Sequence, residues 1–218
     1  MTYSGDVKVG GPADERELAG LTITKLAVGP MSNNAYLLVD RASGEGLLID
    51  AANEGERLLA LIGDVPLATI VTTHRHGDHW QALPAVAAAT GARTVAHEFD
   101  ASELPVPVTA TVAHGDTIPV GSSTLSVVHL RGHTPGSIAL AYEDGDGVTH
   151  LFTGDSLFPG GAGNTEKDAA RFTSLLDDLE SRVFGVYADS TWVYPGHGDD
   201  TTLGAERPSV PEWRARGW

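Results

Sequence analysis

The sequence predicts an α/β protein in which two mixed β-sheets pack face to face with helices on the outside. Two observations support this fold class. Short apolar runs of strand length recur along the chain, bounded by turn residues. They occur in the order strands, helix, strand, helix, then more strands, a helix and a strand, which suits an αββα sandwich. No long polar linker interrupts this order, so we expect one domain over residues 1–218.

The first half of the chain supplies strands and two helices. Residues 1–20 are polar and are expected to form a lead-in segment or an edge hairpin. Alternating or apolar runs predict four strands, and a fifth short run closes this half. The expected strands are Leu21–Val28, Asn34–Val39, Leu47–Ile49, Leu67–Val71 and Arg93–Ala96. The expected helices are Glu54–Ile62, with Asn53 or its neighbour as the cap, and Trp80–Thr90, which ends at Gly91.

The second half predicts two hairpins, the strongest helix and a last strand. The expected strands are Thr117–Val120, Thr124–Leu130, Ser137–Tyr142, Val148–Phe152 and Thr191–Tyr194. The helix is expected over Asp168–Phe184, because its apolar residues recur near one face. Residues 158–165 read as a glycine-rich loop, and residues 204–218 as an irregular tail.

Composition narrows the functional classes. The formal net charge is −15, with only 14 Lys and Arg among 218 residues, and cysteine is absent. An acidic chain without a basic run is not expected to bind nucleic acid, because phosphates need clustered cations. Without cysteine, neither a disulfide nor a thiolate site can form. The absence of a signal-like or membrane-spanning apolar stretch leads us to expect a cytoplasmic protein.

The densest chemical signal is the segment Thr72–His79, which reads Thr-Thr-His-Arg-His-Gly-Asp-His. It follows an apolar strand, where α/β sheets place their ligand sites. Imidazole nitrogens and carboxylate oxygens bind zinc and related cations at about 2.0–2.2 Å. Alternation along an extended segment lets His74 and His76 share one ion, while Asp78 and His79 begin a second site. The alternative is a hydrophilic loop that happens to be rich in histidine.

Three further candidates lie just after predicted strands and are surrounded by glycine. They are His133 in Gly-His-Thr-Pro-Gly-Ser, Asp155 in Thr-Gly-Asp-Ser-Leu-Phe and His197 in Pro-Gly-His-Gly. Glycine permits tight turns that bring the backbone close to a bound group. Each residue alone is more often an ordinary loop residue, but the three together with the His-rich segment predict a metal site.

These four ordered motifs resemble those of the metallo-β-lactamase-fold hydrolases, and most of all the short glyoxalase II-like hydroxyacylglutathione hydrolases. The resemblance runs from about Leu21 to Glu206 and implies the metallo-β-lactamase fold. It also implies two divalent metal ions, with zinc expected and iron or manganese as alternatives. The implied ligands of the first metal are His74, His76 and His133, those of the second are Asp78, His79 and His197, and Asp155 bridges the two.

The other polar residues near the motifs carry weaker expectations. Asp50 matches a position from which a carboxylate could hydrogen-bond a ligand imidazole, or it could simply be a helix N-terminal aspartate. His129 is expected to pack near the ligand turn. The remaining histidines, His97, His114 and His150, are expected to be surface or loop residues.

The chain also departs from the glyoxalase II pattern. Trp80-Gln81-Ala82 stands where the family commonly has glycine, and Gly163-Asn164 where it often has Gly-Arg. The chain ends about twenty residues after His197, without a basic C-terminal helical region. We therefore expect a smaller, different or less selective thiol carrier than glutathione. The Pro159–Gly163 loop, Trp213 and Trp218 are expected to shape the substrate pocket or a subunit contact.

The implied reaction is hydrolysis of a small-molecule thioester by a hydroxide shared between two metals, with Asp78 or Asp155 passing a proton. Lactone or ester hydrolysis is the nearest alternative. An iron-dependent persulfide dioxygenase, which resembles the same motifs but uses only the first metal position, is another. A metal-binding scaffold without turnover and a nuclease are less favoured. The sequence leaves the oligomeric state open, with a homodimer as one option.

Overall fold

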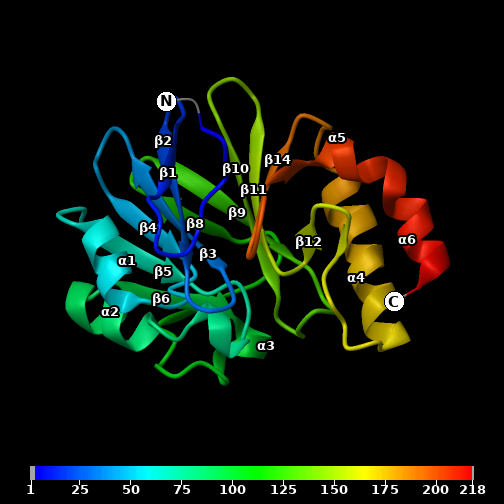
Figure 1. Ribbon diagram of the computed structural model, residues 1–218, viewed down its shortest axis with the longest axis horizontal. Coiled ribbons are helices and arrows are strands. Elements are labelled where there is room, and N and C mark those ends of the chain that lie inside the picture. Colours follow the sequence, from blue (N-terminus) through cyan, green and yellow to red (C-terminus); the bar gives the residue numbers. More distant parts are fainter. Residues whose placement is uncertain (1–2, 218) are drawn as a thin grey trace.

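The computed structural model describes residues 3–217 as two large β-sheets that face each other between layers of helices (Figure 1). The first sheet has seven strands in the order β1-β2-β3-β4-β5-β6-β7. Its pairs are antiparallel from β1 to β4 and parallel from β4 to β7. Its strands are β1 (Asp14–Glu17), β2 (Leu21–Val28), β3 (Asn33–Asp40), β4 (Gly46–Ile49), β5 (Leu67–Val71), β6 (Arg93–His97) and β7 (Ala110–Val112).

The second sheet has six strands in the order β15-β14-β11-β10-β9-β8, and only the β11–β14 pair is parallel. A small hairpin of β12 and β13 follows the end of β11. The strands are β8 (Thr117–Val120), β9 (Ser123–His129), β10 (Ile138–Glu143), β11 (Thr149–Gly154), β12 (Leu157–Phe158), β13 (Gly161–Ala162), β14 (Trp192–Pro195) and β15 (Thr201–Thr202).

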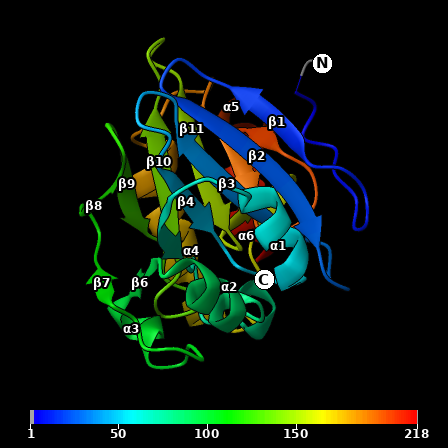
Figure 2. The same cartoon turned by 90° about the vertical axis from the view of Figure 1, so that its left-hand side faces the viewer.

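Helices cover the outer face of each sheet, so the predicted αββα order is confirmed. Figure 2 shows α1 and α2 on the first sheet, with α4 and α6 on the far side of the second. The helical elements are α1 (Gly55–Ile62), η1 (Gly77–His79), α2 (Leu83–Thr90), α3 (Glu98–Ala101), α4 (Ala169–Leu179), η2 (Glu180–Phe184), α5 (Leu203–Glu206), η3 (Arg207–Ser209) and α6 (Val210–Arg216).

The period-two pattern of the strands explains these layers. Leu38 of β3 points into the core between the sheets, whereas its neighbour Leu37 packs in the cluster with α1 and α2. In the second sheet, Leu140 joins the central core and Ala141 faces α4 and α6. Successive side chains on a strand point to opposite faces, so a strand covered on both sides is apolar throughout. Within residues 3–217 no helix is both long and apolar enough to cross a membrane.

Two local expectations are wrong. The helix expected from Trp80 begins at Leu83, because the amides of Gln81 and Ala82 donate to the carbonyl oxygens of Ala52 and Ala51 instead of joining a helix. The short strand β7 was not expected at all; it adds to the parallel edge beside β6.

The expectation of an irregular tail over 204–218 is also wrong for the described residues. α5, η3 and α6 make this segment helical from Leu203 to Arg216. Pro208 and Pro211 each lie in the first turn of a helix, where the missing amide proton costs no hydrogen bond. Trp213 is 2% exposed and packs beside Phe184, so it belongs to the core over the second sheet; Trp218 lies outside the described residues.

Asp40, at the end of β3, ties the two sheets together away from the site. Its Oδ1 accepts hydrogen bonds from the hydroxyls of Ser122 (2.9 Å) and Ser123 (3.0 Å), which lie at the β8–β9 turn of the other sheet. Its Oδ2 accepts from the Ser43 amide (2.9 Å) and hydroxyl (2.8 Å). Although burial opposes ionisation, these donors hold the pKa of Asp40 well below its usual range.

We expect Asp40→Asn to lower the free energy of unfolding by about 1–3 kcal/mol at pH 7, because a charged carboxylate accepts stronger hydrogen bonds than a neutral amide oxygen. A carboxyl with a depressed pKa stabilises the fold fully above its unfolded value of about 4, and this contribution is lost as the pH falls below that value. Urea unfolding at about pH 7 and about pH 3.5, which lie on either side of that pKa, should therefore show the difference shrinking in acid. Asp146→Asn, in an exposed turn, is the control; an equal effect there would contradict the role of Asp40.

Candidate metal centre

The seven candidate ligands all lie beyond strand ends at one edge of the sandwich. His74 and His76 follow β5, and Asp78 and His79 form η1. The loop from β9 to β10 carries His133, the end of β11 leads to Asp155, and the end of β14 leads to His197. Residues that are up to 123 positions apart therefore meet in space, as the positions 74 and 197 show.

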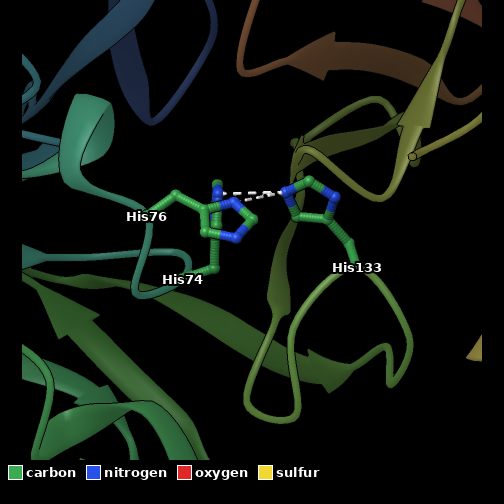
Figure 3. A group of neighbouring side chains, drawn as sticks. All are labelled: His74, His76 and His133. Carbon is green, nitrogen blue, oxygen red and sulfur yellow. Dashed lines mark hydrogen bonds between the residues drawn. The ribbon is translucent and has the colours of Figure 1, made fainter. Parts of the chain in front are cut away.

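The first group consists of three imidazoles whose nitrogens converge (Figure 3). His133 Nε2 lies 3.2 Å from His74 Nε2 and 2.9 Å from His76 Nδ1. These nitrogens fall within 4.8 Å of one another, a spacing that one cation could span. Burial lowers the pKa of all three imidazoles, which therefore stay neutral at pH 7, the state that a metal ligand needs.

The second group combines one carboxylate with two imidazoles. Asp78 Oδ2 lies 3.3 Å from His197 Nε2 and 3.5 Å from His79 Nε2. Burial lowers the pKa of His79, but the Asp50 and Asp155 carboxylates outweigh it and raise that pKa to about 10. For His197 the contacts with Asp155 and Asp78 likewise overcome burial and raise the pKa to about 9. This half of the centre thus attracts positive charge.

Asp155 lies between the two groups. Its Oδ2 is 3.5 Å from His197 Nε2 and 3.6 Å from His133 Nε2, and its Oδ1 is 3.4 Å from His79 Nε2. Asp155 also forms a potential ligand group with His74 and His79. One carboxylate therefore reaches members of both groups, as the bridging assignment requires.

The far nitrogens of the imidazoles are fixed by protein acceptors. His133 Nδ1 donates to Asn164 O at 2.7 Å, His197 Nδ1 donates to Met31 O at 3.0 Å, and His79 Nδ1 donates to Asp50 Oδ2 at 2.8 Å. Each bond keeps one ring proton on the nitrogen away from the centre, so the other nitrogen can bind a cation once it has lost its own proton. The ring orientations are thus set by the fold.

Two buried atoms show that the donor set fits a cation. His79 Nε2 and Asp155 Oδ1 have no hydrogen-bond partner among the described residues, although both are shielded from solvent. An unpaired buried polar atom is costly, and two that face each other at 3.4 Å are satisfied together by a positive ion. Nitrogen and carboxylate oxygen are the ligands that zinc, iron and manganese accept.

Gly196, in the Pro-Gly-His motif, is required by this crowding. A Cβ at position 196 would lie 2.3 Å from Asp155 Oδ1 and 2.7 Å from His79 Cε1. Any side chain there would displace the Asp155 carboxylate. The glycine that the sequence places before His197 is therefore part of the site's geometry.

Asp50 resolves one alternative that the sequence left open. Helix α1 begins at Gly55, so Asp50 is not its N-terminal residue. Its Oδ2 instead accepts from His79 Nδ1 and from the Thr73 hydroxyl (2.8 Å), while its Oδ1 accepts from the Thr73 amide (2.7 Å). The carboxylate orients a ligand imidazole and the start of the ligand loop.

Some residues around the centre escaped the sequence analysis. Asn33 donates from Nδ2 to Asp78 Oδ2 at 2.8 Å and lies 3.4 Å from His197 Nε2. The Asn33-Asn34 pair at the start of a strand was its only signal. Met31 and Asn164 contribute through backbone carbonyl groups, which leave no trace in the sequence.

The histidines outside the seven also differ from expectation. His97 and His150 are buried, so their assignment to the surface is wrong. His150 lies against Tyr194 and Asp144, while His97 stacks on His129 with ring centroids 3.9 Å apart. His129 packs beside the ligand turn, as expected, and its Nε2 lies 2.8 Å from Pro135 O.

The profile of the metallo-beta-lactamase superfamily matches residues 28–197, which contain all seven candidates. The chain belongs to the metallo-beta-lactamase superfamily. A hydroxyacylglutathione hydrolase of Fuscovulum blasticum is 41% identical over 132 residues, which cover 60% of this chain and 50% of that one. An uncharacterized Aquifex aeolicus protein is 30% identical over 207 residues, covering 88% of this chain and 96% of the relative.

Solved structures of superfamily members agree with the fold. ETHE1 from Myxococcus xanthus has a TM-score of 0.75 and 32% identity, covering 88% of this chain and 84% of that one. TTHA1623, solved in a di-iron-bound form, has a TM-score of 0.72 and 31% identity, covering 86% of this chain and 98% of that one. The protein is thus a member of the metallo-beta-lactamase superfamily, and its His and Asp clusters, which could hold metal ions, lie together at the sheet edge.

We expect Asp50→Asn to weaken metal binding by about 10–100-fold, because partners of ligand imidazoles commonly contribute that much. The substitution keeps the size of the side chain but removes the charge that orients His79. Competition with a chromogenic chelator would measure the affinity. Asp64→Asn, on the exposed surface after α1, is the matched control. Equal metal affinity in the Asp50 variant and wild type would exclude this role.

Proposed function

We propose that this superfamily member is a dinuclear metal-dependent hydrolase that cleaves a small acyl thioester. The observation that carries the proposal is the position of Asp155, whose Oδ2 lies near His133 of the first ligand group and whose Oδ1 lies near His79 of the second. His74, His76 and His133 would hold the first cation, and Asp78, His79 and His197 the second. Zinc is the expected metal, with iron and manganese as alternatives.

Bound divalent cations would lower the pKa of water and polarise the substrate carbonyl, which are two roles of metal ions in hydrolases. The chain supplies the proton acceptors. Burial raises the pKa of Asp155 and of Asp78, but contacts with His197 and other neighbours lower both well below their usual range. Both carboxylates are ionised at neutral pH, so either can take a proton from attacking water.

Asp78 is the better placed of the two for proton transfer. Its side chain is 17% exposed, against 13% for Asp155, and Asn33 holds its Oδ2 by donating at 2.8 Å. A carboxylate fixed by one amide keeps a free oxygen for a proton. We infer that Asp78 receives the proton and that Asp155 chiefly positions both groups.

The thioester assignment draws its support from the relatives. Two proteins named hydroxyacylglutathione hydrolase, from Fuscovulum blasticum and Cereibacter sphaeroides, are 41% and 40% identical to this chain over 132 residues. The chain spans about half the length of those relatives. Their names therefore do not identify the thiol carrier of this chain. We propose a carrier other than glutathione, acting in the cytoplasm, with ester or lactone hydrolysis as a secondary activity.

A persulfide dioxygenase is the second candidate, and the ETHE1 neighbour from Myxococcus xanthus favours it. Such an enzyme would need only iron at the first ligand group. The converged second group, with His197 Nε2 at 3.3 Å from Asp78, favours the hydrolase. A ligand group kept so closely assembled has no evident purpose in a one-metal enzyme.

Turnover assays separate these functions. The protein loaded with zinc, iron or manganese in turn should hydrolyse simple acyl thioesters without consuming oxygen, as followed by thiol release and by an oxygen electrode. Oxygen consumption with a persulfide would instead establish the dioxygenase. A protein that binds metal but turns over neither substrate class would refute both.

Metal stoichiometry tests the bridge. Asp155→Ala should reduce binding of both ions together, because its two oxygens lie near members of both groups. His197→Ala should remove the second ion first and leave the first group occupied. Elemental analysis of the purified variants measures this directly. Two ions per chain in Asp155→Ala would show that the bridging assignment is wrong.

A further inference from the structure

A groove beside the first ligand group gathers three cationic side chains. It has a volume of about 380 Å³, and its lining includes Arg75, Arg131, Arg171, Thr134, Pro135 and Ser174. The chain has 14 Lys and Arg against 29 Asp and Glu. Three arginines therefore line one groove of an acidic chain, and any of them without an acidic partner favours an anionic occupant.

Two of these arginines already have acidic partners. Arg131 donates from Nε and Nη2 to the two oxygens of Asp178 at 2.8 and 2.7 Å. Arg171 donates from Nη1 to Glu166 at 2.8 Å and from Nε to Gly132 O at 2.8 Å. Both still contribute donors to the rim, but their charges are largely balanced.

Arg75 is different. Across residues 3–217 its guanidinium has no hydrogen bond or ion pair, although the residue is only partly exposed. Its backbone is fixed on both sides: the amide donates to Asp100 Oδ2 at 3.0 Å, and the carbonyl accepts from Trp80 Nε1 at 2.7 Å. A guanidinium that extends from a fixed backbone and has no acidic partner offers its full set of donors to an incoming anion.

The groove adjoins the ligand residues. Arg75 lies between His74 and His76 in the chain, and the lining residues Gly132 and Thr134 flank His133. Arg171 also donates from Nη2 to His133 O at 2.5 Å, so one side of the groove supports that ligand loop. The first ligand group and the groove thus share a wall.

We propose that this groove binds a carboxylate or phosphate group of the substrate, with Arg75 as the residue that determines this specificity. The inference rests on the proposed function for the identity of the reacting bond. A planar guanidinium matches either anion with two parallel hydrogen bonds. The protein's net charge of −15 repels anions at long range, so a charged substrate needs such a local cation.

The experiment compares thioesters that share one acyl group. Their thiols are 3-mercaptopropionate, its uncharged amide, and 2-mercaptoethyl phosphate. We expect the metal-loaded wild type to prefer one or both anions over the amide in kcat/KM, and the preferred anion identifies the source. Arg75→Gln should lower kcat/KM for that anion about tenfold, which corresponds to roughly 1.4 kcal/mol. The amide should be unaffected.

A second variant and a control guard against a local folding defect. Ser174→Glu, on the α4 side of the groove, keeps Arg75 but supplies it with a competing carboxylate, and should abolish the same preference. Lys8→Gln removes one exposed positive charge outside the groove and should preserve it. Metal content and thermal stability of all three variants should match the wild type.

Sulfate titration by calorimetry supplies a readout that does not need turnover. The wild type and both variants share the same metal centre. Weaker sulfate binding in Arg75→Gln than in the wild type and Lys8→Gln would therefore be due to the loss of the groove arginine. If thioesters are hydrolysed without charge preference and sulfate affinity is unchanged, the groove proposal is overturned and the hydrolase stands. If no thioester is cleaved but Arg75→Gln weakens sulfate binding, the hydrolase proposal fails and the anion site stands.

Discussion

The metal centre depends on how the two sheets are joined at one edge. Two backbone hydrogen bonds cross between them there: the Asn34 amide donates to Gly196 O at 2.7 Å, and the Ile138 amide donates to Thr73 O at 2.9 Å. The acceptor of each bond directly precedes a candidate ligand: Gly196 precedes His197, and Thr73 precedes His74. Ligands carried by different sheets can hold one geometry only if the sheets cannot slide, and these bonds fix them.

The loop that carries His197 is held mostly from the first sheet. Lys25 of β2 is fully buried and donates to Gly198 O (2.8 Å) and Asp200 Oδ1 (2.7 Å). Tyr36 of β3 donates from its hydroxyl to Pro195 O at 2.7 Å. A buried ion pair gives little net stability, but it rejects arrangements in which either charge would be unpaired. Lys25 therefore gives this loop one position, which is what a ligand needs.

The sequence predicted the layers because they follow local rules, and it proposed a ligand set whose members the structure brings close together. Period-two and helical patterns place Leu38 or Phe172 regardless of distant contacts, and His74, His133 and Asp155 each follow a strand. The prediction of an irregular tail failed because proline is unfavourable inside a helix, whereas Pro208 and Pro211 lie in the first turns of helices. Contacts through backbone carbonyls, such as Met31 O, have no sequence signature and required the structure.

The helical tail changes where specificity can reside. Trp213 is buried in the layer over the second sheet, so, contrary to expectation, it does not shape a substrate pocket or a subunit contact. The loops at the sheet edge, where Met31 is 60% exposed and Arg75 lies on its groove, are then the place where we propose that the substrate is recognised. Other positions on these loops can vary while the candidate ligands keep their places just after the strands. A shared ligand set and a distinct substrate preference are therefore compatible in the same fold.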